Sequence, residues 1–466
     1  METKTETGLK IFFGDKSFYK KLVVIAVPIM VQNGITNVVS LLDNIMVGQV
    51  GTEQMTGVAI VNQLLFVYFL CLFGGLSGVG IFTAQYYGQR DDEGVRHTFR
   101  YKLWMGFFIT ALAVCAFIFF GRELMSLYIE SDASAASAEA TLGYGQTYMN
   151  IIVLAAPSMF LVNTYAGTLR DCGRTAMPMI AGICAVLVNL VLDYLLIFGK
   201  LGLPELGVAG AAIATVIARY VELLIVVIYC HTHKRDYPYI RGLYKTLKVP
   251  VRMVKEFFIK GMPILVNEAV WSVGMAFLMQ CYSVRGLEVI AAFNINNVIS
   301  NVLNVIFFAM GDAVAIIVGQ LLGAGRMEEA KRTDTKIIAT AVMSGVIVAI
   351  GLCVASRFFP GLYNTSDEVR TLASKFILIQ ALFTPQIALL HTSYFTLRAG
   401  GKTLITFLFD SGFVWVFSVP IAFCLSRFTN IDVVWIFACV NLAELLKCIF
   451  GIVLVKKGTW MNTITV

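Results

Sequence analysis

Polar and acidic residues inside long apolar stretches are the part of this sequence best able to do chemistry. Asp43 and Asp193 lie in two such stretches, and Asn189 precedes Asp193 by one helical turn. Thr215 lies about nine residues into a third stretch, roughly 13 Å along a helix, at a similar depth. Two carboxylates, an amide and a hydroxyl form an all-oxygen cage, which suits a hard cation.

The same four residues are equally suited to hold a proton. Two close carboxylates cannot both carry a charge at low cost, so one of them favours the protonated form. An ionised carboxylate at membrane depth costs at least roughly 2.5–3.5 kcal/mol, which makes each one a functional hypothesis. Either aspartate taken alone could instead cap a helix near the membrane surface. The grouping favours a cation or proton site at Asp43, Asn189, Asp193 and Thr215.

A second pair of acids lies in the C-terminal half of the chain. Glu268 and Asp410 each lie about seven residues into an apolar stretch, so both reach the same depth, roughly 10 Å along a helix. The helical face of Glu268 continues through Trp271 and Met275, which would suit an organic cation: a carboxylate for charge, a ring for cation–π contact and methionine for adaptable packing. Such a stripe is equally typical of helix packing, and both interpretations remain open.

A row of asparagines marks another stretch. Asn297 and Asn301 belong to a series with Asn294 and Asn304, spaced by three and four residues along one helical face. Amides facing lipid would lack partners, so this face must point inward. It either lines a watery substrate cavity or makes hydrogen bonds between helices.

The elements that must position these residues are membrane helices. The 466 residues are 58% hydrophobic and only 14% charged, against roughly 25% charged in soluble domains. Mean hydropathy is +0.78, which excludes a soluble enzyme, a disordered chain and a small secreted module. The apolar runs are continuous rather than alternating, which favours helices over barrel strands. Twelve spans are predicted: 22–48, 57–83, 103–120, 142–169, 175–199, 206–230, 261–284, 289–323, 337–355, 376–397, 404–426 and 431–455.

Lysine and arginine residues predict the orientation. Twenty-eight of them fall in the termini and alternating loops on one side, and six fall on the other side. The positive-inside rule then places both termini in the cytoplasm. The net charge of +7 follows from these loops and does not indicate nucleic-acid binding. Ten cysteines without a CxxC pair indicate neither zinc nor a disulfide framework, and the polar N-terminus shows no removable signal peptide.

The chain also repeats itself. LFGGLSGVGIFTAQYYG (72–88) aligns with FFAMGDAVAIIVGQLLG (307–323), and TLRDCGRT (168–175) aligns with TLRAGGKT (396–403). The order is preserved, which predicts two parallel six-helix repeats, 1–230 and 261–466, joined by a basic cytoplasmic linker at 231–260. Transporters commonly use this arrangement, and gene duplication also builds channels and scaffolds. The acids inside the spans favour a transporter.

Several motifs resemble the multidrug and toxic compound extrusion (MATE) family. They are P-(x14)-D-N-I-M-V-G in the first span, Q-Y-Y-G-Q-R, L-R-D-C-G-R-T, N-L-V-L-D-Y-L-L-I-F-G and G-V-A-G-A-A-I-A-T. The resemblance implies an all-α polytopic antiporter whose two bundles form a V. It also implies that Asp43, Asn189, Asp193 and Thr215, with Asn163 deeper toward the cytoplasm, fall on the cation or proton positions of its DinF-like branch. The tenth span has no acid, which departs from the NorM-like branch.

The expected function is secondary antiport. The resemblance implies that organic, cationic and amphipathic compounds leave in exchange for H⁺ or Na⁺ by alternating access, and that the protein lies in a bacterial inner membrane. No P-loop is present, so an ion gradient must supply the drive, and no other cofactor, nucleic acid or subunit is expected for this lipid-embedded monomer. One alternative is a lipid-linked oligosaccharide flippase, which would need a basic cavity, whereas the spans hold almost no lysine or arginine. A membrane-embedded enzyme would have to use Asp91 and Asp92, which fit a loop turn better.

Overall fold

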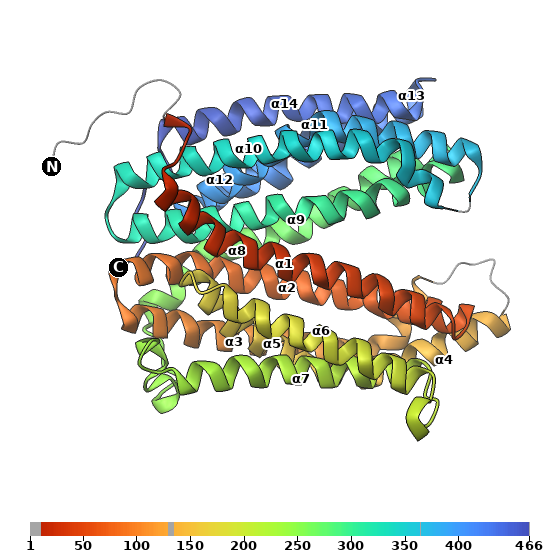
Figure 1. Ribbon diagram of the computed structural model, residues 1–466, viewed down its shortest axis with the longest axis horizontal. Helices are drawn as coiled ribbons and strands as arrows, with labels where there is room; N and C mark the ends of the chain where they lie inside the picture. Colours follow the sequence, from red (N-terminus) through yellow and green to blue (C-terminus); the bar gives the residue numbers. More distant parts are fainter. Residues whose placement is uncertain (1–10, 129–134, 364, 466) are drawn as a thin grey trace. The chain divides into compact units, whose positions relative to one another are not determined.

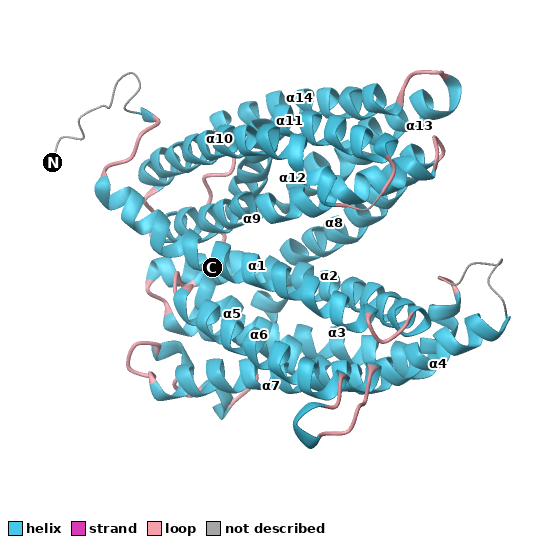
Figure 2. Cartoon of the chain, turned by 45° about the vertical axis from the view of Figure 1, so that its right-hand side comes forward, coloured by secondary structure: helices cyan, strands magenta, loops and turns pink. Residues whose placement is uncertain are grey.

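The computed structural model describes residues 11–128, 135–363 and 365–465, and in this part of the chain every regular element is a helix (Figures 1 and 2). Twelve spans there are long and apolar enough to cross a membrane, which confirms the predicted number. The helices are α1 (Lys16–Gly48), α2 (Thr52–Gln89), α3 (Asp92–Ser126), α4 (Ala135–Ile152), α5 (Ala156–Asp171), α6 (Ala176–Ile197), α7 (Val208–Thr232), α8 (Val251–Ser283), α9 (Leu287–Gly323), α10 (Met327–Phe358), α11 (Asp367–Ala399), α12 (Thr403–Phe407), α13 (Val419–Phe428) and α14 (Val433–Lys457).

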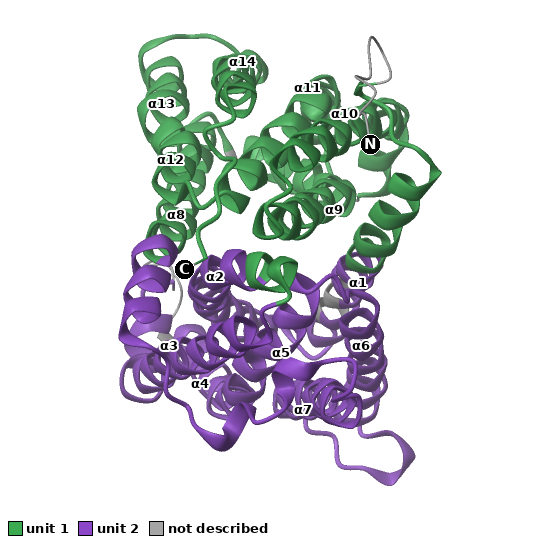
Figure 3. Ribbon diagram, turned by 90° about the vertical axis from the view of Figure 1, so that its left-hand side faces the viewer, with its two compact units in different colours: residues 1–30, 84–90, 262–466 green, residues 31–83, 91–261 purple. Residues whose placement is uncertain are grey.

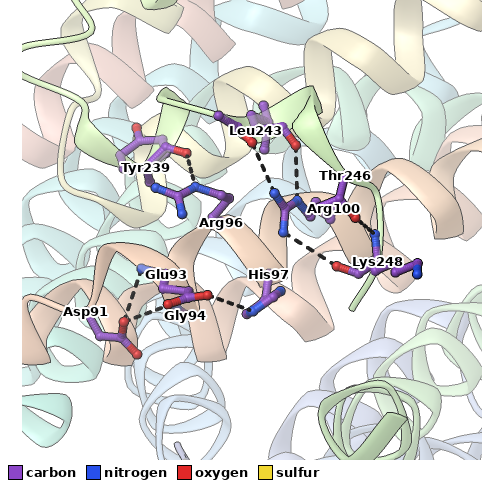
Figure 4. Close-up of polar contacts among 11 residues, drawn as sticks. Asp91, Glu93, Gly94, Arg96, His97, Arg100, Tyr239, Leu243, Thr246 and Lys248 are labelled. Carbon is purple, nitrogen blue, oxygen red and sulfur yellow. Dashed lines mark hydrogen bonds and ion pairs between the residues drawn. The ribbon is translucent and has the colours of Figure 1, made fainter. Parts of the chain in front are cut away.

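Several helices extend beyond the predicted apolar limits. Helix α3 begins at Asp92 rather than 103, because its first turns are polar and hydropathy does not detect them. Asp91 caps this helix: its Oδ1 accepts hydrogen bonds from the backbone N–H groups of Glu93 (3.1 Å) and Gly94 (3.0 Å), as Figure 4 shows. The acidic pair at 91–92 is therefore part of a helix start, which gives it an ordinary structural role.

Two spans are interrupted. The fourth consists of α4 and α5, separated by a 3₁₀ turn at Val153–Ala155 that leads into Pro157. The eleventh consists of α12 and α13, and between them residues 408–412 and 414–418 are π-helical. A π-helical insertion widens the turn and often marks a functional position. Asp410 lies in this segment.

The described chain forms two compact units (Figure 3). Unit 1 contains residues 1–30, 84–90 and 262–466, and unit 2 contains residues 31–83 and 91–261. The predicted halves, 1–230 and 261–466, differ from these units because the start of α1 and the end of α2 group with unit 1. The assignment of the halves and of the linker as functional domains stays a prediction.

The repeat is visible inside unit 1, where the ends of α2 and α9 cross. A Cβ on Gly88 would overlap the backbone carbonyl of Gln320, and a Cβ on Gly323 would overlap that of Gln85. Gly88 and Gly323 are equivalent in the repeat, and so are Gln85 and Gln320. Each glycine packs against the glutamine of the other helix. Glycine is required at both positions because the backbones approach too closely for any side chain.

The linker between α7 and α8 folds onto α3 within unit 2 (Figure 4). Arg96 Nε donates to the carbonyl of Tyr239 (3.2 Å), and Arg100 donates to the carbonyls of Leu243 (3.0 Å) and Gly242 (3.1 Å). Arg100 is 5% exposed. Burial raises the pKa of the Tyr239 hydroxyl well above its ordinary value, so this side chain stays neutral. The linker is thus a fixed part of unit 2, and residues 251–260 belong to α8.

We expect Arg100→Ala to expose the linker to protease. The guanidinium satisfies several linker carbonyls, and a hydrogen bond to a charged group contributes about 1.5–3 kcal/mol. Losing one such bond should raise the open population, and therefore trypsin cleavage after Lys245 and Lys248, at least about tenfold. Arg122→Ala, which removes an exposed arginine at the opposite end of α3, is the control. Equal cleavage rates for Arg100→Ala and wild type would contradict this role.

Candidate functional site

The predicted aspartate pair comes together inside unit 2. Asp43 is on α1 and Asp193 is on α6, and their carboxyl groups are close enough to act on each other electrostatically. Asp193 is 2% exposed, and Asn189, one turn earlier on α6, interacts with it directly. Two buried carboxyl groups this close together are costly when both are ionised, so a shared proton or a bound cation would stabilise the pair.

The amide and hydroxyl predicted for the cluster are also present. Asn189 Nδ2 donates to Thr215 Oγ1 (3.5 Å), and the Thr215 hydroxyl donates to the carbonyl of Ala211 on its own helix, α7 (3.0 Å). Within the described residues, Oδ1 of Asp43 and Oδ1 of Asp193 are buried without a hydrogen-bond partner. Unpartnered buried oxygens are costly unless something occupies them at times. Each carboxyl group of the pair therefore has one oxygen that is free to bind a proton or a cation.

Sequence reasoning missed two neighbours of the pair, Tyr148 and Arg219, and the Asn62 side chain that binds Tyr148. The Tyr148 hydroxyl, from α4, lies against Thr215 and donates to Asn62 Oδ1 on α2 (3.4 Å). Arg219 on α7 acts electrostatically on Asp43, while its guanidinium makes an ion pair with Glu222 (2.9 Å). The available signal was a polar side chain inside the second span and another inside the fourth. Depth alone could not show that they meet the aspartates.

Among the described residues, Asn163 makes no hydrogen bond to this cluster. Its Nδ2 donates to the carbonyl of Met159 one turn earlier on α5 (2.9 Å). A side-chain bond to its own helix satisfies the amide locally. The pair and its immediate partners are therefore Asp43, Asn189, Asp193 and Thr215, and Asn163 remains a prediction based on resemblance.

The C-terminal acids belong to a separate polar network inside unit 1. Asn267, 2% exposed on α8, donates to Asp410 Oδ2 (3.1 Å) and to the hydroxyl of Tyr394 (3.3 Å). The Tyr394 hydroxyl in turn donates to Glu268 Oε1 (3.3 Å). The two acids are thus connected through an amide and a phenol, consistent with the equal depth expected for them.

Asp410 has a partner that the sequence did not predict. Lys447 on α14 places its Nζ 2.9 Å from Asp410 Oδ1, and its side chain is 8% exposed. The local i,i+3 pattern predicts pairing of Lys447 with Glu444, as Arg219 pairs with Glu222, but the ion pair of Lys447 is with Asp410. Lys447 is also a buried basic residue within a span, where almost none was expected. Since Asp410 neutralises it, it does not form a basic cavity for an anionic headgroup.

The other predicted cavity residues divide into two groups. Trp271 packs against a hydrophobic cluster of unit 1, which is a packing role. Met275 is 43% exposed, and Asn297 and Asn301 are exposed along one face of α9. Amides exposed at membrane depth need water, because lipid offers no hydrogen-bond partner. Asn297 and Asn301 are therefore suited to a water-facing surface, and the role of all three residues in the cavity stays a prediction.

Among the described residues, no group of three or more His, Cys, Asp or Glu side chains is placed to hold a metal ion. A cation at the unit 2 pair would have to draw on amide and hydroxyl oxygens as well as the two carboxyl groups. Na⁺ accepts such ligands, since it is a hard cation.

The chain is similar in sequence and in fold to known membrane proteins. The MatE family matches residues 28–195 and 263–424. A relative in Bacillus subtilis, named probable multidrug resistance protein YoeA, is 24% identical over 97% of this chain and 96% of its own length. A MATE family transporter of the MOP superfamily, solved in an outward-facing conformation, has a TM-score of 0.82 at 19% identity, covering 98% of this chain and 99% of its own.

A second solved structure, a mutant of the Vibrio cholerae MATE transporter VcmN, gives a TM-score of 0.83 at 17% identity, covering 96% of this chain and 98% of its own. At these identities the solved structures show the fold alone. The family match covers both halves of the chain, including the spans that carry Asp43, Asp193, Glu268 and Asp410. The protein is therefore an integral membrane protein with twelve spans that belongs to the MatE family of transporters.

Proposed function

We propose that this MATE transporter is a secondary antiporter that exports organic, cationic and amphipathic compounds in exchange for H⁺ or Na⁺. The observation that carries the proposal is the buried pair of Asp43 and Asp193, with unpartnered oxygens and with Asn189 and Thr215 beside it. Relatives across most of the chain's length carry multidrug resistance names, which supports the export of drugs and similar compounds.

The pair gives a physical basis for coupling. An occupied pair is neutral or singly charged, whereas an empty, doubly ionised pair in an apolar surrounding is unstable. A proton or Na⁺ therefore binds more tightly in the conformation that brings the carboxyl groups together than in one that separates them. A ligand shifts an equilibrium between two states only by its difference in affinity for them. The tighter binding of the ion to the closed pair is such a difference, so ion binding shifts the transporter toward that conformation.

We further propose that the chain lies nearer the DinF-like branch than the NorM-like branch. Asp43, Asn189, Asp193 and Thr215 match the ion positions of that branch, and the tenth span, which overlaps α11, has no acid in 376–397. Asp410 is engaged by Lys447. The coupling ion is accordingly assigned to unit 2, with Glu268, Met275, Asn297 and Asn301 as candidate contacts for the organic substrate.

The remaining proposals concern location and partners. The strong excess of lysine and arginine on one side supports a cytoplasmic position for both termini. The proposed location, a bacterial inner membrane, rests on the family and on the bacterial relatives. The halves 1–230 and 261–466 are proposed as the functional repeats, and the linker as a cytoplasmic connection. The partners are small organic substrates and membrane lipid, and the proposed state is a monomer without a cofactor.

Reconstituted vesicles test the function directly. Purified protein is placed in liposomes loaded with ethidium, and a pH gradient or a sodium gradient is imposed, one at a time, with the membrane potential held at zero. We expect one gradient to accelerate ethidium movement and its reversal to slow it. Movement at the same rate with neither gradient would contradict antiport.

A further inference from the structure

Lys447 lies in a more elaborate environment than a simple ion pair requires. Its ammonium is 2.9 Å from Asp410 Oδ1, 5.3 Å from the ring centroid of Phe409 and 6.0 Å from that of Phe413. Both rings are buried, at 7% and 6% exposure. A carboxylate together with aromatic faces is the combination by which proteins recognise ammonium groups.

The backbone of the eleventh span builds this arrangement. Phe409 and Asp410 lie in the π-helical segment 408–412, and Phe413 connects it to the second π-helical segment, 414–418. π-helical turns are rare and are found frequently at functional sites. The wide turns place the acid and both rings around one ammonium supplied by α14.

The carboxylate is held in place without help from Lys447. Asn267 Nδ2 donates to Asp410 Oδ2 (3.1 Å), and Asn267 Oδ1 accepts hydrogen bonds from the Ser411 hydroxyl (2.7 Å) and backbone N–H (3.3 Å). The Ser411 hydroxyl also contacts the carbonyl of Asn267 (2.9 Å). Asn267 and Ser411 are buried, so the acid's position is set by neighbours that are themselves fixed.

The charged groups around Lys447 do not by themselves account for the contacts of its ammonium with the Phe409 and Phe413 rings. Glu444, three residues before Lys447 on α14, is a second acidic neighbour, and His391 and Arg398 on α11 lie in the same region. A hard cation such as Na⁺ prefers a shell of oxygen atoms, whereas here two sides of the ammonium face rings. The chemistry favours an organic ammonium over Na⁺.

We propose that Asp410, Phe409 and Phe413 form an ammonium-binding site in unit 1, and that Lys447 occupies it as a ligand tethered to the chain. The site takes a primary alkylammonium group. Because its own lysine fills it, Asp410 is withheld from the coupling ion and from cationic substrates. This last consequence rests on the proposed antiport, whereas the existence of the site does not.

The test is chemical rescue of Lys447→Ala. Alanine keeps Cβ, so n-propylammonium has the atoms needed to replace the rest of the lysine side chain. The readout is the midpoint of thermal unfolding of the full chain in detergent, with Asp193→Asn added to every protein so that the unit 2 pair does not contribute. We expect Lys447→Ala to lower the midpoint, and n-propylammonium chloride to restore at least half of the loss. Equal concentrations of n-propanol and NaCl should restore much less.

Two control proteins separate the site from general effects of the salt. Lys456→Ala removes an exposed lysine from the same helix and should not respond to n-propylammonium. Asp410→Asn/Lys447→Ala removes both charges and should be more stable than Lys447→Ala, yet lose the rescue. Rescue that is absent, equal in all proteins, or matched by n-propanol would overturn the proposal.

The double variant also keeps the proposal falsifiable if Lys447→Ala gives no folded protein. If Asp410→Asn/Lys447→Ala gives folded protein, the pairing is supported, because the defect of Lys447→Ala then comes from the unpaired Asp410 carboxylate. A double variant no better than the single one would overturn it. Failure of ethidium export in vesicles would leave these results unchanged, so the two proposals fail independently.

Discussion

Asp193→Asn will abolish ion-coupled export while the protein still reaches the membrane at wild-type levels. An asparagine keeps the size and polarity of the side chain but can neither bind a proton nor carry the charge that holds a cation. Asp193 is 2% exposed and interacts directly with Asp43, so no nearby solvent can take its place. Asp43→Asn should have the same effect, since either change leaves a single carboxyl group in the cluster.

The measurement is gradient-driven ethidium efflux from vesicles, reported beside the amount of reconstituted protein. We expect both variants to give the rate of empty vesicles. Asp367→Asn is the matched control, because it makes the same chemical change at a side chain that is 96% exposed at the start of α11. Asp43→Asn and Asp193→Asn are also expressed separately in drug-challenged cells. Full drug resistance with each of the two variants would refute the assignment of the pair.

Asp171→Asn will strongly destabilise the protein without touching the aspartate pair. Lys102 is 2% exposed, and its Nζ donates to Asp171 Oδ2 (2.7 Å) and to the Thr168 hydroxyl (3.3 Å). Removing the carboxylate strands a buried ammonium, and breaking a buried pair in this way costs about 3–5 kcal/mol. The variant should show a clearly lower midpoint of thermal unfolding in detergent.

A double variant isolates the cause. Lys102→Met/Asp171→Asn removes both charges and should recover most of the lost stability, since the penalty comes from the stranded charge rather than from the missing bond. Glu139→Gln breaks an exposed ion pair with Arg122 and should change the midpoint little. If the double variant were as unstable as Asp171→Asn, the interaction would have to be attributed to packing.

Much of the architecture could be predicted from the sequence because membrane insertion depends on local properties. A span needs roughly 20 apolar residues, so hydropathy alone locates twelve helices. Position along a helix gives depth at about 1.5 Å per residue. Depth along the helix predicts that Asp43, Asn189, Asp193 and Thr215 lie at one level, and in the structure they form one cluster.

Neighbours across helices could not be predicted in this way, because depth does not give the rotation of a helix or the identity of the helix beside it. Tyr148 reaches Thr215, whereas Asn163 turns to its own backbone. Lys447 has an acid three residues away on its own helix. It pairs with Asp410 instead, because the packing of α14 places its long side chain beside a π-helical turn of another span. Local sequence determines which residues enter the membrane and how deeply. Long-range packing determines which of them meet, and that is where the charges of this protein acquire their partners.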